Sequence, residues 1–171
     1  NLLVRLGYGP HELLLTINPA QRQIHCPLLL PQLLSLRLTD LVVLGVGPVD
    51  QPAPDSENPW NTDDHQAQFA SLDLLSWDLA LRGARAELLP EISPLAAFRI
   101  PPGVSLQGFD ISGPVTAALH RLKRRASNLR EISSWAGFDR ERAMRLLNAL
   151  YLQSALMATR THPAATGESW T

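Results

Sequence analysis

Few side chains in this sequence have the type and spacing that catalysis or metal binding requires. Asp110, Ser112 and His120 come nearest to a nucleophile with its base, but no Gly-x-Ser-x-Gly turn presents the serine. The histidine also lies eight positions further along, which does not place it on the hydroxyl. His25 and Cys26 are adjacent, so on a strand they point to opposite sides and cannot chelate one ion. We therefore expect no catalytic residue, no metal site and no cofactor, and the protein is predicted not to be an enzyme.

A glycine pair offers a weak signal for phosphate binding. Gly45 and Gly47 follow a predicted strand, where a phosphate-binding loop would lie. The third glycine of such loops is missing, and Pro48 follows in place of a helix start. A plain loop is the better interpretation.

Charge is distributed unevenly along the chain. From residue 111 onward there are nine basic and four acidic residues, so this part carries +5, and residues 1–110 carry −6. Such a division predicts either an acidic partner for the second part or attraction between the two parts.

Three of these basic residues lie at the C-terminal end of the helix predicted at residues 115–125. They are Lys123, Arg124 and Arg125. Cations are stabilised there by the helix dipole, without any partner. The same side chains are also candidates for contacts with DNA phosphates, together with residues of a later helix. The full candidate set for DNA is Arg140, Arg142, Arg145 and Asn148 with Lys123, Arg124 and Arg125.

The helix predicted at residues 140–153 has a face opposite its apolar stripe, which is the candidate partner-binding face. This face consists of Glu141, Arg145, Asn148 and Leu152. Arginine and asparagine can read guanine and adenine edges, but Glu141 would repel phosphates. An exposed Leu152 fits a protein partner better. We therefore favour contact with another protein, or with a second copy, over contact with DNA.

The elements that position these residues form a predicted winged-helix-like module at residues 111–163. Helices are expected at 115–125, 129–135 and 140–153, and a strand at the edge of a wing is expected at 156–161. Pro114 suits a first helical position, and Asn128 and Asp139 are expected N-caps. Gly137 is expected to end the middle helix in a left-handed conformation. Residues 164–171 are predicted to be a loose tail.

Residues 1–110 are predicted to form an α+β domain, with a mixed sheet around a central helix at 66–81. A short helix is expected after Pro31, and residues 49–66, rich in proline and acids, are expected to be a mobile loop. Strands are expected at 2–6, 12–17, 22–26, 39–44, 85–89 and 97–100. The strand at 39–44 is predicted to be buried and to end at the segment from Gly45 to Pro48.

Composition limits the class of protein. The 171 residues are 45% hydrophobic and 18% charged, which is a globular balance. No apolar run approaches the roughly 18 residues of a membrane span. With no charged-then-apolar leader and a single cysteine, the sequence predicts a cytoplasmic protein. The cationic side chains are arginines apart from Lys123, which we interpret as the coding bias of a bacterial genome.

Four short segments resemble a known family. They are Leu33-Leu34-Ser35-Leu36, Leu74-Leu75-Ser76-Trp77, Phe98-Arg99-Ile100 and Asn148-Ala149-Leu150-Tyr151-Leu152. Over residues 28–162 they resemble the PATAN-type domain of bacterial signalling and motility proteins. The resemblance implies an adaptor that acts beside other signalling domains. We therefore expect a non-enzymatic bacterial regulatory or scaffold protein that acts through protein contacts as a homodimer. The alternative is a sequence-specific DNA-binding transcriptional regulator that uses the third helix of the module.

Overall fold

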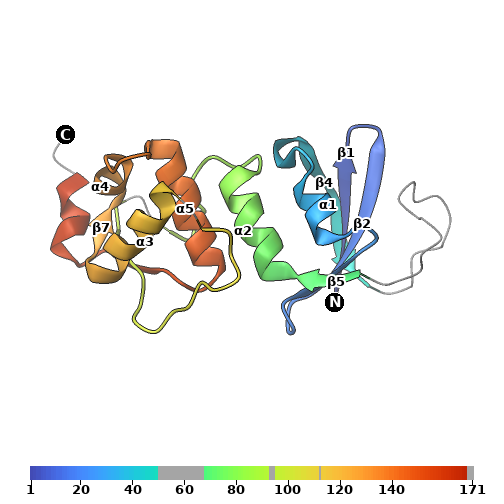
Figure 1. Ribbon diagram of the computed structural model, residues 1–171, viewed down its shortest axis with the longest axis horizontal. Helices are drawn as coiled ribbons and strands as arrows, with labels where there is room; N and C mark the ends of the chain where they lie inside the picture. The colour runs from blue at the N-terminus through green and yellow to red at the C-terminus, as the bar shows by residue number, and fades with distance from the viewer. Residues whose placement is uncertain (50–67, 93–94, 112, 169–171) are drawn as a thin grey trace. The chain divides into compact units, whose positions relative to one another are not determined.

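The computed structural model describes residues 1–49, 68–92, 95–111 and 113–168 of an α+β chain (Figure 1). It divides into two compact units, Asn1–Leu79 and Ala80–Thr171. The predicted α+β class is confirmed, but the sequence predicts the division after residue 110, and that position is wrong. The expected mobile loop at 49–66 lies, apart from Val49, outside the described residues.

The first unit contains a five-stranded sheet with the order β4-β1-β2-β3-β5. All four strand pairings are antiparallel, so the prediction of a mixed sheet is wrong. For two of these pairings the reason is local, because short turns join β1 to β2 and β2 to β3, and a short turn permits only antiparallel pairing. The strands are β1 (Leu2–Tyr8), β2 (His11–Asn18), β3 (Gln23–Cys26), β4 (Leu41–Pro48) and β5 (Gln68–Ser71).

The core of the first unit lies on one face of this sheet. Alternate strand residues, among them Val4, Leu15 and Ile24, are buried there, as the two-residue period of a strand requires. Three helices follow the strands: α1 (Leu30–Leu34), the 3-10 helix η1 (Leu38–Asp40) and α2 (Leu72–Arg82), which begins in the first unit and ends in the second. Leu33 of α1 and Leu75 of α2 complete the core. The helix predicted at 66–81 therefore starts later than expected, because residues 68–71 form β5.

The second unit contains a three-stranded sheet with the order β7-β6-β8. The central strand β6 (Ala97–Arg99) pairs with both β7 (Ser127–Asn128) and β8 (Met157–Thr159). Residues 80–110 therefore belong with the helical module, which explains why the predicted division is wrong. Residues 85–89 are predicted as a strand but form irregular backbone.

Local signals place the helices of the second unit accurately. They are α3 (Pro114–Arg124), α4 (Leu129–Ser133) and α5 (Arg140–Leu152). Asn128 caps α4 by accepting a hydrogen bond from the backbone N–H of Glu131 at 2.8 Å, and Asp139 caps α5 in the same way at 2.8 Å from Arg142. Both predicted caps are confirmed. Phe98 of β6, Leu122 of α3 and Leu147 of α5 are fully buried.

The end of the chain differs from the prediction of a loose tail. Residues Pro163–Glu168 form a 3-10 helix, η2. Ala165 is buried, and the Asn128 side-chain amide donates a hydrogen bond to the carbonyl of Ala164 at 2.9 Å. One amide thus caps α4 with its oxygen and holds η2 with its nitrogen. The tail prediction is wrong for residues 164–168.

The turn between α4 and α5 contains a close contact. Gly137 has φ of 81°, in the left-handed region that the sequence predicts for it. A Cβ at this position would lie 2.3 Å from Cγ of Pro114, the first residue of α3. Position 137 therefore requires glycine for two reasons, namely its positive φ angle and the close approach of the first residue of α3.

Candidate functional site

The predicted partner-binding face of α5 is largely covered by its own unit. Asn148 is only 2% exposed. Its side-chain oxygen accepts a hydrogen bond from the N–H of Leu89 at 2.9 Å, and its amide nitrogen donates to the carbonyl of Glu87 at 2.8 Å. The expectation that Asn148 faces a partner or a DNA base is therefore wrong. Its amide instead satisfies the backbone of the irregular segment 85–89.

Arg145 is also used within the unit. Its side chain is 13% exposed and forms an ion pair with Glu141. Its Nη1 donates to the carbonyl oxygens of Gly83 at 2.8 Å and Ala80 at 3.4 Å. Carbonyls at the end of a helix lack intrahelical partners, and a cation is favoured beside them. Arg145 thus caps the end of α2, and the prediction that it reaches DNA or a partner is wrong.

The residues of α5 that remain exposed lie at its two ends. Arg140, Glu141 and Arg142 are exposed at the start, and Tyr151 and Leu152 are exposed at the end. Residues 146–150 between them are all buried. A helix that reads a DNA groove needs a continuous exposed face, which α5 does not offer.

The basic residues predicted at the end of α3 are exposed, and two of them line an open cleft of about 560 Å³. Arg124 contributes to it as the last residue of α3 and Arg125 as its C-cap, and Arg99 contributes from β6. Lys123 points elsewhere, into a second pocket. The sequence did not indicate Arg99, since only the pairing of β6 with β8 brings it to this place.

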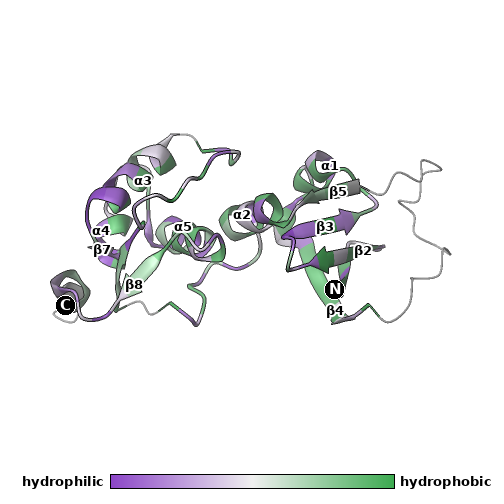
Figure 2. Cartoon of the chain, turned by 90° about the horizontal axis from the view of Figure 1, so that it is seen from below, coloured by the Kyte–Doolittle hydropathy of each residue, from purple (hydrophilic) through white to green (hydrophobic). Residues whose placement is uncertain are grey.

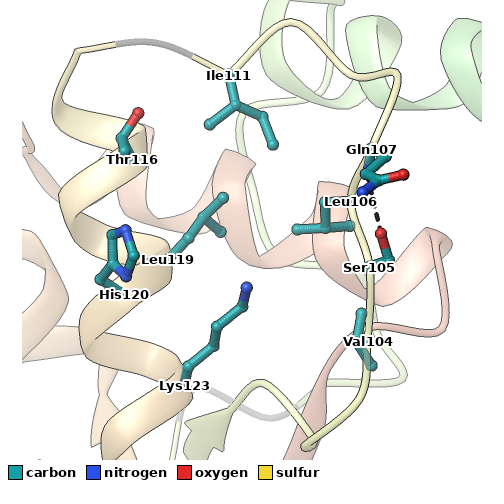
Figure 3. Close-up of a pocket in the computed structure, with 9 residues that line it drawn as sticks. All are labelled: Val104, Ser105, Leu106, Gln107, Ile111, Thr116, Leu119, His120 and Lys123. Carbon is teal, nitrogen blue, oxygen red and sulfur yellow. Dashed lines mark hydrogen bonds between the residues drawn. The ribbon is translucent and has the colours of Figure 1, made fainter.

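The pocket into which Lys123 points has a volume of about 370 Å³ and lies between residues 104–111 and α3 (Figure 3). Leu106 and Leu119 extend into it from opposite sides, and Lys123 directs its amine into the same space. His120 also lines it, but Ser112 lies outside the described residues. No carboxylate or thiol is among its described lining residues, so the pocket brings no acid–base pair together.

The most unusual surface of the first unit is the edge strand β4. Its four large apolar side chains Val42, Val43, Leu44 and Val46 are between 51% and 61% exposed. Figure 2 shows the strand as hydrophobic. The sequence predicts a buried strand here, and that prediction is wrong because β4 pairs only with β1 and has no neighbour on its other side among the described strands. Gly45 and Gly47 lie within this strand, not in a phosphate-binding loop.

Both faces of β4 are apolar at this edge. Val46 lies opposite the buried Val4 of β1 and so shares the core face of the sheet, whereas Val42 lies opposite Gly7 on the other face.

The pairing shifts between Arg5 and Leu6, which leaves Leu44 as a bulge. Leu44 packs over Gly7, where an added Cβ would meet its side chain at 3.3 Å. No residue of β4 carries a charge, although charges commonly protect edge strands.

The described part of the chain shows two further absences. None of its helices is long and apolar enough to cross a membrane. Among the same residues, no three His, Cys, Asp or Glu side chains gather as a metal site would require.

The comparisons with known proteins add no assignment to this geometry. No family model matches the chain, and neither a curated protein nor a solved structure matches it significantly.

Proposed function

We propose that this protein is a non-enzymatic interaction module that self-associates through the open edge of β4. The observation that carries the proposal is the exposure of four large apolar side chains on an edge strand without charges. Contiguous exposed apolar surface of this kind is typical of protein interfaces. The backbone of the same edge offers unpaired N–H and C=O groups, which can hydrogen-bond a further strand.

A second copy of the chain is the occupant that fits this edge best. Two antiparallel β4 strands related by a two-fold axis present the same residues to each other, as a symmetric dimer requires. Their side chains are apolar, so no like charges meet across the axis. Val43 and Val46 would extend the core of one copy into that of the other, and Val42 with Leu44 would pair on the opposite face. A standard interface covers about 800 Å² per partner. The two β4 strands would form the centre of such an interface.

We infer that the second unit is winged-helix-like in architecture. The order α3, α4, α5, β8 supports this, since it is the helix, helix, helix, strand order that the sequence predicts, and the short strand β7 between α3 and α4 is additional to it. The unit departs from that pattern in its central strand, because β6 precedes α3 and takes the place beside β8. With α5 covered by residues 80–89, we propose that the module serves as a structural support and not as a reader of DNA.

The cellular role that we propose is that of a cytoplasmic adaptor or scaffold in bacterial signalling. The resemblance to PATAN-type domains supports it, as do the open edge of β4 and the internal use of Arg145 and Asn148. Sequence-specific regulation of transcription remains the weaker alternative. The exposed Lys123, Arg124 and Arg140 are the residues that would carry it.

The oligomeric state tests the proposal directly. We expect the full chain to be a dimer by light scattering after gel filtration. The double variant Val42→Lys, Val46→Lys places a charge on each face of β4 and should shift the mass to that of a monomer. Circular dichroism melting should show that the monomeric variant is still folded, because both side chains are exposed.

Two matched controls locate the interface. Phe69→Lys changes an exposed side chain on β5, at the opposite edge of the same sheet, and should leave the dimer intact. Leu152→Asp changes the exposed end of α5 and should also leave it intact. A monomeric wild type, or a dimer that only Phe69→Lys or Leu152→Asp disrupts, would refute assembly through β4. Tight, sequence-selective DNA binding at physiological salt would favour the alternative function.

A further inference from the structure

The open cleft beside β8 gathers basic side chains from distant parts of the second unit. Arg99 comes from β6, Arg124 and Arg125 from the end of α3, and His162 from the chain before η2. Thr159 of β8 adds a hydroxyl, and Glu131 of α4 is the carboxylate in the lining. The described lining of the cleft therefore holds three guanidinium groups against one carboxylate.

Ion pairing within the cleft leaves two of these guanidinium groups uncompensated. Arg125 binds Glu131, with 2.7 Å between Nη2 and Oε2. Arg99 makes one long hydrogen bond, of 3.5 Å, from Nη2 to the carbonyl of Lys123. The side chain of Arg124 makes no hydrogen bond or ion pair with the residues that the structure describes. Nothing among these contacts neutralises Arg99 or Arg124, so the described lining of the cleft carries a local charge of +2.

A histidine supplies a further donor. His162 accepts a hydrogen bond at Nδ1 from the backbone N–H of Ala164, at 3.1 Å. Nδ1 is occupied as an acceptor in this contact, so Nε2 is the ring nitrogen that can donate to a ligand. The cleft thus combines two fixed positive charges with imidazole and hydroxyl donors, and a volume of about 560 Å³ leaves room for a small group.

We propose that this cleft binds a phosphate monoester. A monoester carries close to two negative charges at neutral pH, which matches the two uncompensated guanidinium groups. Its three terminal oxygens also suit the paired donors of Arg99 and Arg124. A carboxylate or a phosphodiester has one charge and would leave one arginine unneutralised. The monoester can belong to a small molecule or to a phosphorylated side chain of a partner, since the chemistry that the cleft recognises is the same.

Isothermal titration of the full chain with phenyl phosphate tests the proposal. We expect saturable one-to-one binding, and weaker binding of dimethyl phosphate and of acetate, which carry a single charge. Arg99→Gln and Arg124→Gln should each reduce the affinity by about tenfold or more, because each removes a charged hydrogen-bonding partner. Arg140→Gln is the matched control. It removes an exposed arginine outside the cleft and should leave the affinity within about twofold.

Further arms of the titration separate the sources of the group. A phosphoserine peptide that binds more tightly than phenyl phosphate, and loses this advantage when dephosphorylated, identifies a partner's side chain as the source. Equal affinities identify a small molecule. The proposal is overturned if phenyl phosphate does not saturate, if dimethyl phosphate binds equally well, or if Arg140→Gln weakens binding as much as Arg124→Gln. Duplex DNA that binds more tightly than either monoester would also overturn it.

Discussion

At the scale of single residues, the chain uses its most informative polar side chains to hold itself together. The sequence shows that α5 carries Arg145 and Asn148 on one face, but it does not show that residues 80–89 cover that face. The positions of the helix and its caps depend on neighbours within a few residues, so they can be predicted. The bonds from Asn148 to Glu87 and Leu89 join residues about sixty positions apart, and no local pattern indicates them.

Asn148→Ala should therefore act as a stability variant and not as a binding variant. It leaves the N–H of Leu89 and the carbonyl of Glu87 without their partner, which should lower the free energy of unfolding by about 1–3 kcal/mol. Urea denaturation of the variant against wild type measures this loss. Arg140→Ala, on the exposed first turn of the same helix, should change the free energy by less than about 0.5 kcal/mol. If Asn148→Ala is as stable as wild type, the amide does not support residues 85–89.

Cys26 provides a second test at this scale. Its thiol is buried in the core of the first unit, and burial raises its pKa. A raised pKa means that less thiolate is present at any mildly alkaline pH, so the folded protein should react slowly with a disulfide reagent at pH 8. In denaturant the same thiol should react at the rate of a free cysteine. Rapid reaction in the folded protein would show that this part of the core opens readily.

At the scale of elements, the sequence predicts where the helices of the second unit and most strands of the first unit lie, but not which strands are neighbours. Helix starts are marked by Pro114, Asn128 and Asp139, and each of these signals acts within one turn. The sequence of β4 carries no comparable local signal that shows which strands lie beside it. A run of apolar residues is equally consistent with a central strand and an open edge, and only the order of the strands distinguishes them.

The turn before α5 offers a sharp test of how two elements meet. Gly137→Ala adds a Cβ in a left-handed conformation and also pushes it toward Pro114, so α3 or the turn must move. Gly103 has a similar φ of 82°, but no atom lies within 4 Å of its added Cβ. Gly103→Ala should therefore cost only the left-handed backbone term of about 1–2 kcal/mol. Gly137→Ala should cost at least about 1 kcal/mol more, as measured by urea denaturation. Equal costs would mean that the approach of α3 is not tight.

At the scale of the whole molecule, the structure places the division of the chain about thirty residues before the predicted one. A fragment of residues 80–171 retains β6 and the buried Ile92, Phe98 and Ile100, whereas a fragment of residues 111–171 lacks them all. We expect the longer fragment to melt cooperatively. The shorter one should not, because it loses the central strand of its sheet and part of its core. Calorimetry of the two fragments measures this, and a cooperative transition in the shorter fragment would support the predicted division instead.

Under the self-association that we propose, the open edge of β4 also has a consequence before assembly is complete. A strand whose outer edge stays apolar and open in the finished unit presents the same template to any other chain while that chain is still folding. Strand β4 carries no charge that would repel another chain, whether that chain is folded or unfolded. Pairing between two folded copies then competes with aggregation of partly folded chains, and the outcome of this competition depends on the protein concentration. The first pairing partner that each newly made chain meets therefore decides between a soluble assembly and an insoluble one.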